Sequence, residues 1–221
     1  MRGYGQFCPV AIASEIFAER WTPLVVRELS CGSHRFNDLL RGLPRIPRSV
    51  LVQRLRTLEA TGVIERRVNP QRTGVEYHLT EAGQDLSQIV LELGFWGKRW
   101  ANTDVRPERI DTDLLVWDMH RRLLTEHLPQ ERTVIQIAFT GAVERDYWMI
   151  LEHGAVSVCW NDPGFEPDLT LSADAVVLHR VWLGDVSFTS ALRDGTLSLS
   201  GDRSLCRAFP GWLQLSVFAT R

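Results

Sequence analysis

The chain has 221 residues, 44% of them hydrophobic, and a formal net charge of -2 at pH 7. This length is enough for two domains. No apolar run approaches the roughly 18 residues of a membrane-spanning helix, and the N-terminus has no signal-peptide pattern. We therefore expect neither a membrane protein nor a secreted one, but a cytoplasmic protein.

The charges are divided unevenly along the chain. Residues 1–102 hold 14 Lys and Arg against 10 Asp and Glu, whereas residues 103–221 hold 11 against 17. The first part is therefore basic and the second acidic. This division favours two domains with different partners over one extended nucleic-acid surface.

Arginine is concentrated in one short segment of the basic part. Between residues 34 and 72 the chain has nine Arg and three acidic residues. Such a basic patch inside a nearly neutral protein is expected where a protein binds a phosphate backbone. The nine are Arg35, Arg41, Arg45, Arg48, Arg54, Arg56, Arg66, Arg67 and Arg72.

Upstream in this segment, residues 35–41 carry apolar side chains at helical spacing, and Gly42–Leu43–Pro44 ends the pattern. A second helix is predicted over residues 47–61, with Pro47 in its first turn and Gly62 just past its end. The two helices with their short connection predict a helix-turn-helix. At about 100° per residue, one stripe of the second helix is apolar and should face the core. That stripe consists of Leu51, Leu55 and Leu58.

The opposite face of this second helix is polar. Ser, Gln and Arg side chains can hydrogen-bond to base edges in a major groove, valine can contact a thymine methyl group, and flanking arginines can hold phosphates. An ordinary solvated face is the alternative interpretation. The face carries Ser49, Gln53 and Arg56, with Val52 to one side and Arg48 and Arg54 on the flanks.

Two strands are predicted after this helix, over residues 63–68 and 75–79, joined by the turn-rich loop 69–74. A hairpin that follows the second helix of a helix-turn-helix is the wing of a winged helix. Arg67 and Arg72 would then be placed to contact the adjacent minor groove or the DNA backbone.

Short motifs over about the first hundred residues follow one another in a family-specific order. They are Cys8-Pro9-Val10, Trp21-Thr22 with Leu24, Arg35-Phe36-Asn37-Asp38-Leu39, Leu43-Pro44, Leu51 with Gln53-Arg54-Leu55, Leu58-Glu59, Gly62, and Val75-Glu76-Tyr77-His78-Leu79-Thr80 with Gly83. In these motifs the sequence resembles the HxlR-type winged helix-turn-helix regulators of bacteria.

The resemblance implies that this part binds double-stranded operator DNA. The chain departs from the family at the tip of the wing, where residues 71–74 replace consecutive prolines. The candidate DNA-binding residues are Arg35, Arg45, Arg48, Ser49, Val52, Gln53, Arg54, Arg56, Arg67 and Arg72.

The same resemblance implies a homodimer that pairs through a helix near the N-terminus and a long helix after the wing. The long helix is predicted over residues 81–102, with Thr80 as its N-cap. An exposed apolar stripe of this kind usually marks an interface, although packing on the chain's own second domain is a competing explanation. The stripe would contain Leu86, Ile89, Val90, Leu93 and Trp96.

The four cysteines have no metal-site spacing, so no metal is expected. Structural disulfides are also unexpected in the cytosol. Cys8 stands at the family's N-terminal cysteine position, which some relatives use to sense oxidants. A plain buried thiol is the interpretation that the sequence favours, because no basic residue neighbours Cys8 in the sequence to activate it.

A domain boundary is expected in the polar stretch of residues 103–113, which gives domains 1–103 and 104–221. After it, a helix is predicted over 114–127. Mixed strands and helices follow, so the fold class is α+β. The predicted strands are 133–140, 147–151, 156–160, 168–172 and 196–200, and the further helices are 174–182, 186–193 and 203–209.

Residues 130–215 resemble the sterol-carrier-protein-2-like (SCP2-like) fold, a sheet covered by helices around an apolar cavity. The resemblance rests on residues 168–174, Gly184 and residues 191–202, and it implies a pocket for an apolar molecule without a shared catalytic apparatus. Aromatic side chains could line such a pocket, or they could simply fill a small core. The second part of the chain contains five tryptophans, of which Trp117 is the first. The candidate ligand-binding residues are Trp148, Trp160, Trp182 and Trp212.

The sequence shows no catalytic motif, so we expect no enzyme and no cofactor. The leading hypothesis is a dimeric transcription regulator whose C-terminal domain senses a small apolar ligand. A second hypothesis makes that domain only a dimerisation or protein-docking platform. A third, a lipid carrier or enzyme accessory whose winged helix serves only protein contacts, does not account for the density of arginines.

Overall fold

The computed structural model describes residues 3–68, 74–101 and 106–220. The chain divides into two compact units, Met1–Arg99 (unit 1) and Trp100–Arg221 (unit 2), each described by itself. Within the described ranges, no helix is long and apolar enough to cross a membrane.

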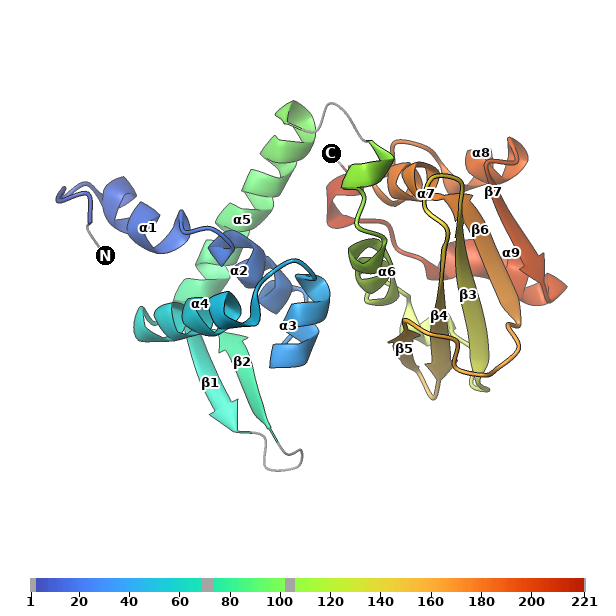
Figure 1. The fold of residues 1–221 in the computed structure, drawn as a ribbon, viewed down its shortest axis with the longest axis horizontal. Helices are drawn as coiled ribbons and strands as arrows, with labels where there is room; N and C mark the ends of the chain where they lie inside the picture. Colours follow the sequence, from blue (N-terminus) through green and yellow to red (C-terminus); the bar gives the residue numbers. More distant parts are fainter. Residues whose placement is uncertain (1–2, 69–73, 102–105, 221) are drawn as a thin grey trace. The chain divides into compact units, whose positions relative to one another are not determined.

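Unit 1 is a winged helix with additional helices before and after it (Figure 1). The predicted helix-turn-helix and the antiparallel hairpin are confirmed. One detail differs: Pro47 occupies the N-cap position just before the second helix and does not belong to its first turn. The elements are α1 (Pro9–Phe17), α2 (Thr22–Ser30), α3 (Phe36–Gly42), α4 (Arg48–Ala60), β1 (Ile64–Val68), β2 (Val75–Leu79) and α5 (Glu81–Trp100).

The start of α5 is fixed to the wing by both a side chain and a close backbone approach. The hydroxyl of Thr80 accepts a hydrogen bond from the amide of Gly83 at 3.2 Å and donates to the carbonyl of Gly62 at 2.6 Å. Thr80 is therefore the N-cap that the sequence predicted. A Cβ atom on Gly83 would lie 2.1 Å from the carbonyl oxygen of Val63. Only glycine lets α5 approach β1 this closely.

Unit 2 is a five-stranded sheet with helices on one face, in the predicted α+β class. The strand order is β5-β4-β3-β6-β7, and only the β3–β6 pair is parallel. The elements are η1 (Pro107–Arg109), α6 (Thr112–His120), η2 (Thr125–His127), β3 (Thr133–Thr140), β4 (Arg145–Glu152), β5 (Ala155–Cys159), β6 (Leu169–Asp174), α7 (Ala175–Trp182), α8 (Phe188–Arg193), β7 (Leu197–Gly201), α9 (Arg203–Trp212) and η3 (Val217–Thr220).

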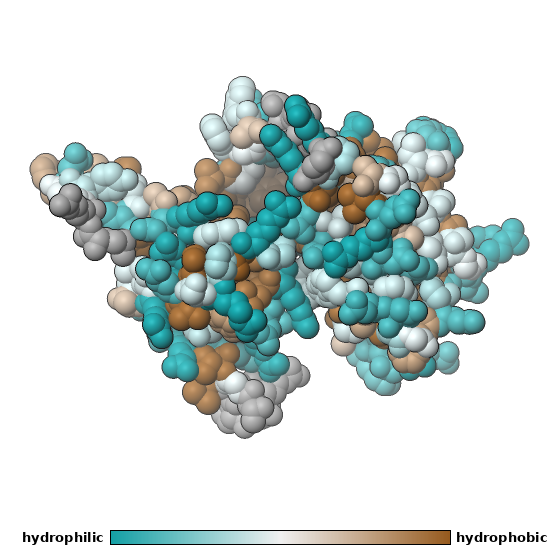
Figure 2. All heavy atoms as spheres, viewed as in Figure 1, coloured by the Kyte–Doolittle hydropathy of each residue, from teal (hydrophilic) through white to brown (hydrophobic). Residues whose placement is uncertain are grey.

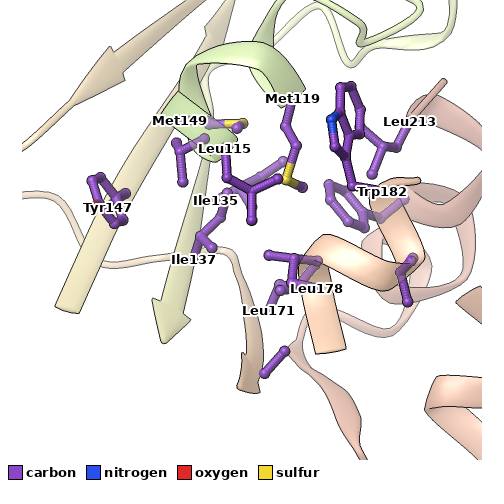
Figure 3. Packing of buried hydrophobic residues seen from close by; sticks show 14 of the residues in the cluster. Leu115, Met119, Ile135, Ile137, Tyr147, Met149, Leu171, Leu178, Trp182 and Leu213 are labelled. Atoms are coloured by element: carbon purple, nitrogen blue, oxygen red, sulfur yellow. The ribbon is translucent and has the colours of Figure 1, made fainter. Parts of the chain in front are cut away.

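Alternation along the strands decides which face of this sheet is covered. In β3, Ile135, Ile137 and Phe139 are buried, whereas Gln136 and Ala138 between them are half-buried. The buried residues pack with side chains of α6 and α7 in one apolar layer, and the labelled residues of Figure 3 point toward one another there. The core of unit 2 therefore lies between the sheet and its helices.

The predicted helix over residues 114–127 is wrong in its second half. Helix α6 ends at His120, and residues 125–127 form a separate short turn of 3-10 helix. The intervening chain pairs with the C-terminal segment, because the amide of Leu124 donates to the carbonyl of Trp212 at 2.8 Å and that of Gln214 donates to the carbonyl of Arg122 at 2.9 Å. These contacts are distant in sequence, so helical spacing could not reveal them.

The other predicted elements of unit 2 are present with shifted ends. Side-chain caps explain two of the shifted starts, because Asp174 and Ser187 each accept a hydrogen bond from an amide of the following helix. Asp202 caps α9 in the same way, at its predicted first residue. The Ser204 hydroxyl and the amides of Leu205 and Ser204 hold the pKa of Asp202 below its usual value. The predicted helix over residues 203–209 continues to Trp212.

A buried tyrosine connects the start of α6 to β4. The hydroxyl of Tyr147 donates to Asp113 Oδ1 at 2.7 Å and lies 2.7 Å from the hydroxyl of Thr112. Burial raises the pKa of Tyr147, so the hydroxyl keeps its proton and remains a donor to the carboxylate.

We predict that Gly83→Ala destabilises unit 1, by about 1–3 kcal/mol, because the new methyl group must push the backbone of β1 away from α5. Hydrogen exchange of the full-length protein should show lower protection of the amides in β1 and α5. The matched control is Gly97→Ala in the same helix, where an added Cβ meets nothing within 4 Å. Equal protection in the two variants would contradict the prediction.

Candidate nucleic-acid interface

The turn between α3 and α4 is anchored by apolar residues. Leu43 and Ile46 are buried on either side of the exposed Pro44 and Arg45. The amide of Ile46 donates to the carbonyl of Leu43 at 2.9 Å, which closes the turn. Pro47 follows in an extended conformation, immediately before α4. The position of α4 therefore follows from packing within unit 1 and needs no ligand.

Helix α4 has the apolar stripe that the sequence predicted. Leu51, Leu55 and Leu58 are at most 3% exposed. Their side chains belong to the core of unit 1, together with residues of α2 and α3. The predicted phase of this helix is confirmed, so its opposite face is directed away from the core.

The outward face of α4 carries the predicted hydrogen-bonding side chains. Ser49, Gln53 and Arg56 are exposed, and Val52 beside them is half-buried. The three polar side chains can form hydrogen bonds and follow one another at the spacing of successive helical turns, and Val52 offers methyl groups. This combination can read base edges in a major groove.

The predicted arginines differ in what their guanidinium groups already contact. Arg45 is exposed shortly before α4 and Arg48 is exposed as its first residue, with its guanidinium 5.4 Å from the ring centre of Phe36. Arg67 is exposed on the wing and forms an ion pair with Glu65. Arg72 lies outside the residues that the structure describes.

Arg54 has a different environment from its neighbours. Its side chain is only 12% exposed, and its Nη2 donates to Glu19 Oε2 at 2.7 Å. Its Nε donates to the carbonyl of Arg20 at 3.0 Å. This predicted DNA contact is therefore engaged with the connection between α1 and α2.

Arg35 is partly engaged in the wing, through Glu76 of the Val-Glu-Tyr-His motif, for which the sequence predicted no such contact. Its Nε lies 3.7 Å from Glu76 Oε1, and the two residues form an isolated β-bridge. The rings of His34 and His78 stack at 4.2 Å, and His34 Nδ1 lies 3.1 Å from the carbonyl oxygen of Tyr77. These contacts fix the start of α3 to the hairpin. The mixed polar pattern of residues 75–79 was the only signal for them.

The four candidate tryptophans of unit 2 do not share one face. Trp182 and Trp212 are 6% exposed and belong to the core between the sheet and the helices. Trp148 pairs in register with Gln136 and Cys159, on the other face of the sheet. Trp160 is half-buried, and its ring centre lies 5.9 Å from that of Trp117.

Cys8 is exposed, so the sequence-based preference for a buried thiol is wrong. It precedes the first residue of α1, in a segment with few buried neighbours. Among the residues that the structure describes, no group of three or more His, Cys, Asp or Glu side chains could hold a metal ion.

Comparison with known proteins agrees with both halves of this description. Residues 16–105 match the family of HxlR-like helix-turn-helix proteins, and residues 127–214 match the SCP-2 sterol transfer family. Both resemblances inferred from the sequence are thus confirmed.

Similar proteins include two uncharacterized HTH-type transcriptional regulators of Bacillus subtilis (strain 168). YvaP is 37% identical over 97 residues, which cover 43% of this chain and 90% of YvaP. YybR is 37% identical over 99 residues, which cover 44% of this chain and 78% of YybR. Among solved structures, the reduced form of the redox regulator HypR is 34% identical and has a TM-score of 0.40, covering 43% of this chain and 95% of HypR.

The relatives that match unit 1 are thus transcriptional regulators that it covers for most of their length. The helix-turn-helix, the wing and the polar face of α4 are the parts that such a regulator needs to meet a duplex. The chain belongs to the HxlR-like helix-turn-helix family and is a DNA-binding transcription regulator.

Proposed function

We propose that the protein reads an operator by placing α4 in the major groove, with the wing against the adjacent minor groove or backbone. The observation that carries this proposal is the division of α4 into a buried leucine stripe and an exposed face of Ser49, Gln53 and Arg56. Exposed arginines border this face, so base reading and phosphate contacts can occur together.

The roles of these residues predict two kinds of variant. Gln53→Ala or Arg56→Ala should relax the base preference and cost about 1–3 kcal/mol on the preferred site. Arg48→Ala or Arg67→Ala should weaken all duplexes similarly and reduce the salt slope by about one per lost phosphate contact. Selection from random DNA followed by binding titrations at several salt concentrations measures both effects. An unchanged preference in Gln53→Ala would contradict the orientation of α4 proposed here.

We propose further that the regulator is a homodimer, paired through α1 and α5. Helix α5 has two apolar stripes, because Leu86 and Val90 pack against the core of unit 1 while a second stripe is exposed. The exposed stripe has the alternating three- and four-residue spacing of a helix that packs against another helix. It consists of Ile89 (58% exposed), Leu93 (46%), Trp96 (58%) and Trp100 (61%).

The N-terminal segment adds to this surface. Phe7, Val10 and Ile12 are more than half exposed, and apolar residues reach the surface around α1 in Figure 2. Large apolar side chains of two helices in water are expected to be covered by another surface. A second copy is the proposed cover, because two copies of α4 would fit a pseudo-palindromic operator.

Leu93→Glu and Trp96→Glu should therefore convert the dimer to a monomer, because each would place a carboxylate in the apolar interface. Sedimentation velocity measures the change, and footprinting should show one symmetric protected region for the parent protein only. The control is Val68→Glu, which replaces an exposed apolar residue of the wing (75% exposed). A monomeric parent protein would favour the competing explanation that α5 packs on unit 2.

We also propose that unit 2 senses a small apolar ligand. The support is the match of residues 127–214 to the SCP-2 sterol transfer family. Trp182 and Trp212 belong to the core of unit 2, so a ligand that enters this core would change their indole fluorescence. The alternative is a protein-docking platform, which would leave the core closed.

A ligand that binds only folded unit 2 should raise its melting temperature and, if the sites are coupled, change operator affinity by about 1–3 kcal/mol. Native mass spectrometry of the purified full-length protein would detect a co-purifying apolar molecule, and fatty acids, sterols and flat aromatic compounds are the probes for a thermal-shift screen. Binding of a probe without any change in operator affinity would favour the docking platform.

A further inference from the structure

The connection between α1 and α2 is held by a side chain of the DNA-facing helix. Arg54 of α4 donates from Nη2 to the carboxylate of Glu19 at 2.7 Å and from Nε to the carbonyl of Arg20 at 3.0 Å. Both nitrogens are thus used on adjacent residues of one short connection. Because the Arg54 side chain is 12% exposed and Glu19 is 35% exposed, the pair is shielded more than an ordinary surface ion pair.

This connection has an unusual backbone that needs external support. Trp21 has a φ of 79°, in the left-handed region, which is rare for a bulky side chain. Such a conformation persists only when the surroundings hold it. The Trp21 ring packs partly against the core of unit 1, and the amide of Thr22 donates to the carbonyl of Glu19 at 3.0 Å. Arg54 adds two side-chain hydrogen bonds to this connection, to the Glu19 carboxylate and the Arg20 carbonyl.

Helix α1 depends on this connection for its direction. Of its residues, all of which the structure describes, only Ala11 is buried. Its apolar residues Val10 and Ile12 are exposed and belong to the dimer surface proposed above. Ile16 near the end of α1 packs against the core of unit 1. This contact and the turn that joins α1 to α2 together set the direction of the helix.

We infer that Arg54 is a positioning residue that couples the dimer-forming helix α1 to the DNA-facing helix α4, and so sets the spacing of the two half-sites that the dimer accepts. This inference rests on the proposed function. It assigns Arg54 to the connection of residues 18–21 and removes it from the phosphate contacts. Without the hydrogen bonds of Arg54 to Glu19 and Arg20, which we call the Arg54 clamp, each α4 could still read its half-site. The distance between the two copies of α4 would then vary more.

The test compares variants of the full-length protein on DNA selected by the parent protein, with the spacer between half-sites varied by about two base pairs in each direction. Arg54→Met keeps the length of the side chain and removes both donors. Glu19→Gln weakens one arm of the clamp. Arg48→Met is the matched control, an exposed arginine of the same helix that does not contact the connection.

Arg54→Met should bind all spacers with nearly equal affinity while its salt slope stays unchanged. Glu19→Gln should lose part of the same discrimination and add nothing in the Arg54→Met background, since the two residues act as one unit. Arg48→Met should keep the spacer preference and lose about one unit of salt slope. Without DNA, hydrogen exchange at residues 18–22 should be faster in Arg54→Met than in Arg48→Met.

A lower salt slope in Arg54→Met, together with a neutral Glu19→Gln, would make Arg54 a phosphate contact and overturn the inference. An unchanged spacer preference and unchanged exchange in Arg54→Met would overturn it as well. If Arg54→Met does not fold, Glu19→Gln carries the test through the same spacer series and exchange measurement. Failure of the parent protein to select any DNA would instead overturn the proposed function, which separates the two cases.

Discussion

The arrangement of unit 1 depends on one buried carboxylate. Glu28 of α2 is 0% exposed, and its side chain accepts hydrogen bonds from the guanidinium of Arg27 and, at 3.0 Å, from the hydroxyl of Ser33. A Cβ atom on Gly42, the last residue of α3, would overlap Glu28 Oε2 at 1.8 Å. Burying a carboxylate costs several kcal/mol unless its oxygens are paired and hydrogen-bonded. Helices α2 and α3 therefore have one favourable register, and α3 carries the turn that leads into α4.

The arginines of the basic segment also differ in whether they have a carboxylate partner within the protein. Nine arginines between residues 34 and 72 suggest a large phosphate-binding surface, but several of them have partners within the protein. Arg35 lies beside Glu76, Arg41 lies 3.4 Å from Asp38, and Arg54 holds Glu19. An arginine that must leave an internal carboxylate to meet a phosphate gains less than an unpaired one. We therefore expect fewer phosphate contacts than arginines in this segment.

Periodicity in the sequence was sufficient to predict the helices and strands of the winged helix, because each of these elements buries one regular face. The leucines of α4 and the cap at Thr80 illustrate this, and both were predictable from spacing alone. The contacts of Arg54 and Glu28 were not, since Arg54 bonds to a connection more than thirty residues away in the sequence and the burial of Glu28 depends on the absence of a side chain at Gly42. The early end of α6 escaped prediction for the same reason. Its cause is pairing of residues 122–124 with residues 212–214, about ninety residues away.

The tryptophans of unit 2 show why composition cannot distinguish a cavity from a core. A single layer of helices on one face of a sheet leaves space that large side chains fill efficiently. Trp182 and Trp212 occupy that layer, and Phe209 lies against Trp212 with ring centres 6.2 Å apart. Trp148 belongs to the other face only because it alternates with Tyr147 and Met149, which are buried. Strand alternation and the position of the helices thus divide the tryptophans between the two faces of the sheet, and their number in the sequence carries no information on that division.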